Sequence, residues 1–154
     1  MDKLARKLQP AEGYFELQMY QEAWDELDQL AEEAQHQPVV LEFRTMIQMN
    51  QEKWEGALSS AEALCEGAPD EHSGFIHAAY CLHELGKTED AKNKLYNGPA
   101  TLQKDPLYFY NLACYEAQLG ETDTARNWLN RACKLDESLE TQAQSDPDLQ
   151  PLWE

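Results

Sequence analysis

One small residue recurs at a fixed interval along most of the chain. Steps of 34 residues from Ala23 reach Ala57, Ala91 and Ala125, so alanine occupies the same place four times. A constant period of this length is typical of helical repeats, in which one helix pair cannot bury its apolar face without neighbours. An ordinary helical bundle gives no reason for a constant spacing. The period therefore predicts stacked helix pairs.

Other positions repeat with the same period and indicate where the helices pack. Twelve residues before each alanine stands a small residue: Ala11, Thr45, Ala79 and Ala113. Small residues in register let two helices approach closely, while larger ones fill the remaining space. A turn position holds Gly86 and Gly120, but Gln18 and Glu52 in the first two copies. The predicted antiparallel pairs cover residues 10–35, 39–66, 73–96 and 107–134.

These copies resemble the tetratricopeptide repeat, a unit of about 34 residues with the pattern W-x2-L-G-x2-Y, then A-x3-F, then P. The last copy, "YNLACYEAQLG" followed by "TARNWLNRA", keeps Leu112, Ala113 and Gly120 at pattern positions. The third copy, "FIHAAYCLHELGKTEDAKNKL", matches nearly as well. Departures are Arg44 at an expected leucine and "NGP" at 97–99, which we expect to end a helix.

The resemblance covers residues 8 to 137 and implies an all-α fold. We expect a right-handed α-solenoid of four helix pairs with a short C-terminal capping helix, in a single domain. The implied repeats and tail occupy about 4–37, 38–71, 72–105, 106–139 and 140–154. The ending "SDPDLQPLWE" is also similar to one found on many bacterial proteins of this family.

The chemistry of this ending can be interpreted directly. Ser145 or Asp146 can cap a short helix that has Pro147 at its first position. Three apolar residues would then cover the last repeat: Leu149, Leu152 and Trp153. Terminal repeats need such a cover. A tail that instead inserts into a partner stays an alternative, because tryptophan and leucine also anchor interfaces.

The charge of the chain narrows the choice of partner. Twelve Lys and Arg stand against 29 Asp and Glu, which gives a formal net charge of −17. This balance disfavours nucleic acid and anionic membranes, since both are bound through Lys and Arg. It allows a basic partner, although acidity also serves solubility alone. The N-terminus lacks the apolar run of a signal peptide. We expect a protein of the cytoplasm.

A search for catalytic or metal-binding residues gives little. The four cysteines lie in apolar helical contexts without a CxxC pair, which favours buried, reduced thiols. His77 and Cys81 share a helix face, and His72 and His83 are near in sequence, but a metal site needs three or four converging ligands. Gly-rich phosphate loops and nucleophile motifs are missing from the sequence. We therefore expect no enzyme activity, no cofactor and no metal.

The resemblance implies that the chain binds a partner on a concave groove lined by the first helix of each repeat. Transfer of the family's pattern gives the expected groove residues: Glu12, Phe15, Glu42, Met46, Met49, Ile76, Tyr80, His83, Glu84, Tyr110, Cys114 and Gln118. Such a surface suits a protein or peptide segment with apolar anchors and basic residues. The alternative is that other parts of the chain fill the groove.

The expected function is accordingly a non-enzymatic protein–protein interaction module, or scaffold, that acts as a monomer or weak dimer. Two alternatives remain open at this point. The same groove would serve a small acidic secretion-type chaperone that holds a client, or a regulatory subunit that masks an enzyme. The identity of the partner does not follow from the residues.

The alanine period generates a test of the register. Ala125→Trp places a large ring at a predicted tight helix contact, and overpacking of this kind costs about 1–3 kcal/mol or more. We expect the melting temperature to fall, as followed by circular dichroism. An unchanged melting temperature would show that the register is wrong.

Overall fold

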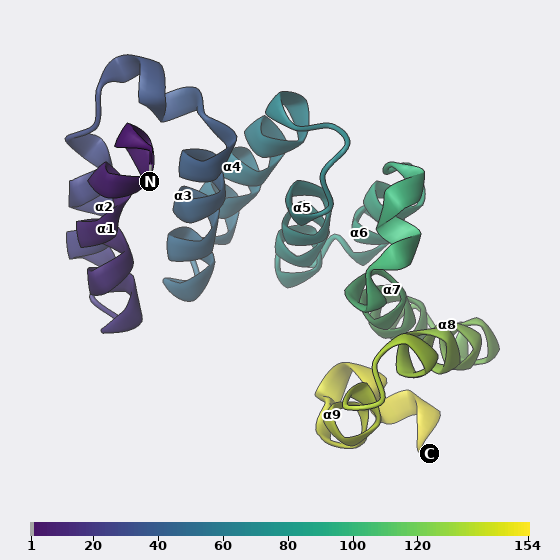
Figure 1. Cartoon of the computed structure of the whole chain (residues 1–154). Coiled ribbons are helices and arrows are strands. Elements are labelled where there is room, and N and C mark those ends of the chain that lie inside the picture. The colour runs from purple at the N-terminus through teal and green to yellow at the C-terminus, as the bar shows by residue number, and fades with distance from the viewer. Residues whose placement is uncertain (1) are drawn as a thin grey trace. The chain divides into compact units, whose positions relative to one another are not determined.

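The computed structural model describes residues 2–154, and within this range all regular structure is helical. By contacts, the chain divides into two compact units, Met1–Pro69 and Asp70–Glu154, and each is described here by itself. Each unit contains two antiparallel helix pairs, which Figure 1 shows along the colour gradient. Among the described helices, none is both long and apolar enough to cross a membrane.

The first unit pairs each odd-numbered helix with the helix that follows it. Its elements are α1 (Lys3–Glu16), α2 (Tyr20–Asp28), the 3-10 helix η1 (Glu32–His36), α3 (Pro38–Asn50) and α4 (Trp54–Gly67). A core of Leu8, Leu27, Val40 and Ile47 joins α1, α2 and α3. Because these side chains come from three helices, neither pair is buried without the other.

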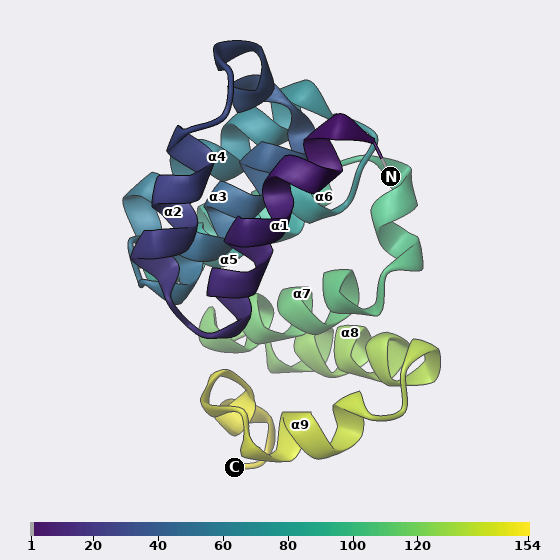
Figure 2. The same cartoon turned by 60° about the vertical axis from the view of Figure 1, so that its left-hand side comes forward.

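The second unit repeats this arrangement and adds a C-terminal extension. Its elements are α5 (Ser73–Glu84), α6 (Thr88–Tyr96), η2 (Ala100–Lys104), α7 (Pro106–Gln118), α8 (Thr122–Leu135), α9 (Leu139–Ser145) and η3 (Pro147–Leu152). Helices α7 and α8 lie side by side, and α9 follows along α8 (Figure 2). Helix α7 is the most buried element, since α6, α8 and η3 all pack against it.

The repeated small residues are the points of closest helix packing, as predicted. Ala23, Ala57, Ala91 and Ala125 are all fully buried. The second set is buried as well: Ala11, Thr45, Ala79 and Ala113 all have 0% exposure. Thr45 satisfies its hydroxyl by donating to the carbonyl of Leu41 at 2.7 Å. The register read from the 34-residue period is therefore the register of the packing.

The four turns inside the pairs share one backbone conformation although their residues differ. Gly86 and Gly120 have φ of 80° and 87°, and Gln18 and Glu52 have φ of 60° and 57°. The left-handed region costs an L-residue about 1–2 kcal/mol more than the right-handed one. The first two turns thus adopt, at a cost in conformational energy, the same conformation that glycine adopts without steric strain in the last two.

The helix ends depart from the sequence prediction in three places. Helix α1 begins at Lys3 rather than near residue 10, because Asp2 caps it by accepting from the amide of Ala5 at 2.8 Å. Helix α2 ends at Asp28 rather than near 35, and η1 follows. The extension contains α9 in addition to the expected short helix. Helix α6 ends at Tyr96, directly before the "NGP" stretch, as expected.

Arg44, which stands where the family pattern has leucine, fastens α3 to α2 and η1. Its guanidinium donates to Asp28 Oδ1 at 2.9 Å and to Gln35 Oε1 at 2.6 Å. It also lies 4.3 Å from the ring centroid of Trp24, a cation–π distance. An arginine that stacks on Trp24 and donates two hydrogen bonds therefore takes the place of the usual apolar contact.

A buried ion pair connects α6 to α7. Glu116 is only 5% exposed, and its Oε1 lies 3.1 Å from Nζ of Lys92. Lys92 also pairs with Glu89 at 3.1 Å. Hydrogen bonds to Glu116 and then Glu89 raise the pKa of Lys92, so the ammonium stays charged. Loss of one partner would leave the other charge uncompensated.

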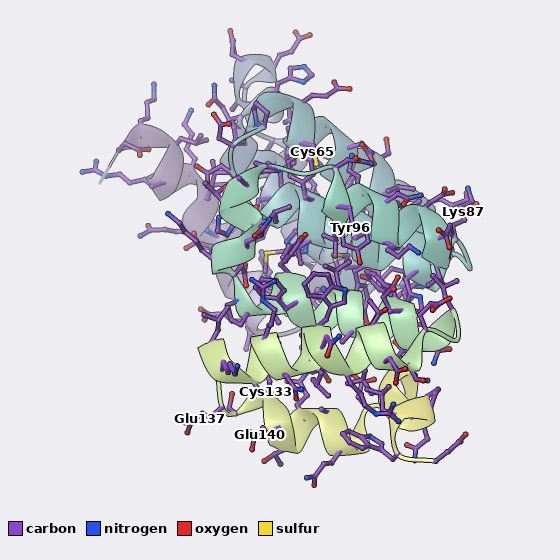
Figure 3. The ribbon with its side chains drawn as sticks, turned by 90° about the vertical axis from the view of Figure 1, so that its right-hand side faces the viewer. Cys65, Lys87, Tyr96, Cys133, Glu137 and Glu140 are labelled. Atoms are coloured by element: carbon purple, nitrogen blue, oxygen red, sulfur yellow. The ribbon has the colours of Figure 1, made fainter. Side chains whose placement is uncertain are left out.

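We predict that Lys92→Met lowers the free energy of unfolding by about 1–3 kcal/mol, because the Glu116 carboxylate stays buried without a counter-charge. Adding Glu116→Gln should recover most of the loss. Urea unfolding measures both changes. The control is Lys87→Met, at an exposed lysine just before α6 (Figure 3). Equal stability of the Lys92 and Lys87 variants would contradict the role of the ion pair.

Candidate functional site

The C-terminal tail, residues 140–154, folds back onto α7 and α8. Leu149 and Leu152 are buried at 0% and 5% exposure and join the core of the second unit. Trp153 stays 48% exposed, while its indole nitrogen donates to the carbonyl of Ala143 at 3.3 Å. The expected cover of the last repeat is thus confirmed for the two leucines, and the tryptophan lies half outside.

Local chemistry explains why the tail turns at Asp146. Its Oδ1 accepts from the amide of Asp148 at 3.0 Å, and Pro147 is the first residue of η3. This is the cap that the sequence predicts. Because Oδ1 is used by the cap, Oδ2 is left to face α7.

Expected groove residues on α7 contact this tail. The Tyr110 hydroxyl donates to Asp146 Oδ2 at 2.7 Å, and Cys114 Sγ lies 3.9 Å from the same oxygen. The Gln118 amide donates to the carbonyl oxygen of Asp148 at 2.8 Å. Tyr110 and Cys114 are buried, at 3% and 5% exposure. On α7, therefore, the chain's own tail occupies the predicted binding surface.

His83 joins α5 to the same junction. Its Nε2 lies 3.0 Å from Asp148 Oδ2, and its Nδ1 lies 2.9 Å from the Thr88 hydroxyl. The imidazole ring also packs on Tyr115, with centroids 5.1 Å apart. Both ring nitrogens are thus engaged, so the ring orientation is fixed.

Burial sets the protonation of the thiols. It raises the pKa of Cys81 to about 11, with a further contribution from the charge of Glu84. Burial and then the charge of Asp146 raise the pKa of Cys114 well above its usual range. The pKa of Tyr110 is also raised, first by burial and then by its hydrogen bond to Asp146. These thiols are protonated at neutral pH, the opposite of what a nucleophilic cysteine needs.

The remaining predicted groove residues of the second unit differ in their exposure to solvent. Ile76 is buried at 8% exposure and belongs to the core. Tyr80 is 39% exposed and Glu84 is exposed, so this part of α5 faces solvent. The pKa of Tyr80 is raised, first by burial and then by the charges of Glu84, Asp148 and Asp146. Tyr80 therefore lies within an acidic surface shared by α5 and the tail.

The predicted groove residues of the first unit differ in burial, and some of them pack against the core. Phe15 packs edge-to-face against both Tyr20 and Phe43, with centroids 5.5 Å apart in each case. Glu12 is exposed on α1. Three residues of α3 are half-buried: Glu42, Met46 and Met49. Phe15 acts mainly in packing, whereas the α3 residues remain partly accessible.

The polar role of the tail is not evident from the sequence. The sequence predicts a cap at Asp146 and no role for Asp148, although both carboxylates bond to the first helices of the repeats. His83 and Asp148 are 65 positions apart. The D-P-D spacing in the sequence does indicate that two carboxylates lie on one short turn. It does not indicate which side chains they contact, because that depends on how the tail packs.

Comparison with known proteins supports the fold. No protein-family model matches the chain, and no curated protein does. Nine chains of solved structures match. One of them, titled "MamA MSR-1 C2" and containing tetratricopeptide repeats, has a TM-score of 0.71 and 16% sequence identity, with 90% of this chain and 82% of that chain covered. The expected all-α fold of tetratricopeptide-type helix pairs is thereby confirmed.

The tail generates a prediction that combines stability with thiol reactivity. Deletion of residues 146–154 should lower the free energy of unfolding by about 3 kcal/mol or more, because two fully buried leucines are lost. Cys114 should then react faster with iodoacetamide, since the tail no longer covers it. Urea unfolding and timed alkylation with peptide mass spectrometry measure these effects.

Cys81 provides the internal control, because it is fully buried on α5 and lies outside the tail junction. Its alkylation should change little. If Cys114 and Cys81 gain reactivity equally, the deletion has loosened the whole unit, and the tail is not a specific cover of α7.

Proposed function

We propose that this chain is a non-enzymatic protein–protein interaction module that holds a partner segment on the surface around Tyr80. The fold supports a protein-binding role in general. The observation that carries the proposal is the environment of Tyr80, an aromatic side chain 39% exposed beside Glu84 and the tail carboxylates. Tyrosine supplies apolar contact area together with a polar tip, and it is enriched among residues that dominate binding.

The charges around Tyr80 define the chemistry of the partner. Burial and then the negative charges of Glu84, Asp148 and Asp146 raise the pKa of the phenol, so this surface carries a negative potential. A partner segment with an apolar anchor and neighbouring Lys or Arg complements it. The net charge of −17 would speed the approach of such a segment at low salt.

The first unit offers a second surface of similar chemistry on α3. Met46 and Met49 are half-buried and lie on the same helix as the half-buried Glu42. Thioethers adapt to differently shaped apolar groups, which suits binding of varied segments. We propose that this surface contributes apolar contacts, while recognition of charge rests on Glu12 and Glu42.

The cellular compartment and the oligomeric state are part of the same proposal. None of the four cysteines is paired in a disulfide, and free thiols are typical of proteins in a reducing compartment. We propose a cytoplasmic protein that acts as a monomer or weak dimer, because one acidic surface is sufficient for a basic segment.

The test begins with a photoreactive amino acid at position 80, which cross-links and identifies the partner in the native cell. Binding kinetics of the purified partner are then measured with two variants. Tyr80→Ala should weaken binding by about 1–3 kcal/mol, mainly through faster dissociation, because a central anchor is lost. Glu84→Lys should slow association and reduce its dependence on salt.

Helix α6 supplies matched controls for both changes. Tyr96 of α6 (Figure 3) is 41% exposed, nearly the same as Tyr80, and its hydroxyl accepts a hydrogen bond from Trp128 of α8. Asp90 is exposed on the same helix. Tyr96→Ala and Asp90→Lys should bind as the unmodified protein does. If Tyr80→Ala binds the partner like Tyr96→Ala, and Glu84→Lys binds it like Asp90→Lys, the α5 surface is not the binding site.

A further inference from the structure

Three potential metal ligands meet where the tail crosses α7. Cys114 Sγ and carboxylate oxygens of Asp146 and Asp148 all lie within 4.8 Å of one another. His83 Nε2 lies next to this cluster, 3.0 Å from Asp148 Oδ2. A thiolate and carboxylates are among the donor types that Zn²⁺ binds in proteins. Cys114 and the two aspartates come together from positions more than 30 residues apart in the sequence.

The spacing of the three donors can be compared with that of a tetrahedral site. With Zn–O bonds of about 2.0–2.1 Å, neighbouring oxygen ligands lie about 3.3 Å apart, and a thiolate increases this to about 3.5 Å. Cys114 Sγ lies 3.9 Å from Asp146 Oδ2, and all three donors lie within 4.8 Å of one another. Side-chain shifts of about 1 Å would bring the three donors to one ion.

The candidate ligands also have the outer contacts that metal ligands need. Asp148 is bonded by His83 Nε2 at 3.0 Å, and His83 Nδ1 is bonded to the Thr88 hydroxyl, which fixes the ring. Asp146 is held by the Tyr110 hydroxyl at 2.7 Å and by the amide of Asp148. Such second contacts orient metal-bound carboxylates.

A second, independent observation comes from Tyr115. Its side chain is 1% exposed, and its hydroxyl has no hydrogen-bond partner. Its ring packs on His83, with centroids 5.1 Å apart, and His83 in turn bonds to Asp148 of the cluster. A buried hydroxyl without a partner is costly. Water bound to a metal ion in the cluster would give this hydroxyl a partner.

We propose that Cys114, Asp146 and Asp148 bind a Zn²⁺ ion, with water as the fourth ligand, while His83 holds Asp148 through an outer hydrogen bond. On binding, the Cys114 thiol releases its proton to solvent and the resulting thiolate forms the Zn–S bond. The two aspartates bind through carboxylate oxygens without redox change. The mixed S and O donor set favours Zn²⁺ over Ca²⁺ and Mg²⁺, which bind almost exclusively oxygen.

The consequence for the protein is a metal-dependent attachment of the tail. The ion would join α7 to the start of η3, which are otherwise held together by hydrogen bonds and the two buried leucines. A ligand that binds only the folded state stabilises it by mass action. Zinc would therefore hold the tail on α7 more tightly. This inference does not depend on the proposed binding of a partner.

The test uses the full chain, stripped of metal with a chelator, and titrates it with Co²⁺ and then Zn²⁺. Cobalt reports the ligands through its absorption spectrum. We expect one equivalent of Co²⁺ to give a thiolate-to-cobalt charge-transfer band and intense tetrahedral bands, both of which one equivalent of Zn²⁺ removes. Zn²⁺ should also raise the melting temperature.

Variants then assign the ligands. Cys114→Ser should abolish the charge-transfer band, and Asp148→Asn should lower Co²⁺ affinity by at least about 10-fold. Tyr110→Phe, which removes an outer contact, should lower the affinity by about 10-fold. Cys81→Ser should leave spectrum and affinity unchanged, since this buried thiol of α5 lies outside the cluster. Circular dichroism checks that each variant is folded.

Two results would overturn the proposal. One is a Co²⁺ spectrum without a thiolate band, which would mean that the abundant surface carboxylates bind the metal. The other is a folded Cys114→Ser or Asp148→Asn protein that binds Co²⁺ like the unmodified chain. Asp148→Asn leaves Cys114 and both buried leucines in place, so it answers the question even if Cys114→Ser does not fold.

Discussion

Close packing of helices at repeated small residues is the constraint on which each unit depends. At Ala23, Ala57, Ala91 and Ala125 the exposed fraction is zero, so no larger side chain fits without moving a helix. The left-handed turn residues fix the angle at which the second helix returns, even where glutamine or glutamate must adopt that conformation. These local choices recur because every pair must present the same shape to its neighbour.

A repeat architecture leaves one apolar face uncovered at its end, and this explains the tail. Leu149 and Leu152 complete the core, while Asp146 and Asp148 meet polar groups of α5 and α7. The cover is thus apolar where it meets the core and acidic where it meets the helix surface. The structural task of capping brings two carboxylates to a thiol and an imidazole, and any chemistry at this junction is a consequence of that task.

The same junction shapes the surface available to other molecules. The α7 residues that were predicted to line a groove are occupied by the tail, whereas Tyr80 and Glu84 of α5 remain accessible. The tail therefore adds negative charge next to an exposed aromatic ring. A site that binds zinc would reduce that charge, because two of its ligands are the carboxylates that influence Tyr80. Metal content and partner preference would then be linked through electrostatics.

The sequence by itself determined the helix pairs, their period, the packing positions and the Asp146 cap, because these depend on contacts within about 34 residues and recur four times. It predicted the residues of a binding surface only by analogy with the tetratricopeptide repeat. Tertiary structure alone decided that Phe15 packs against the core, that Arg44 stacks on Trp24, and that Asp148 meets His83. The last contact joins residues 65 positions apart, and no periodic pattern specifies such a pair, since it depends on where a unique tail packs after the repeats end.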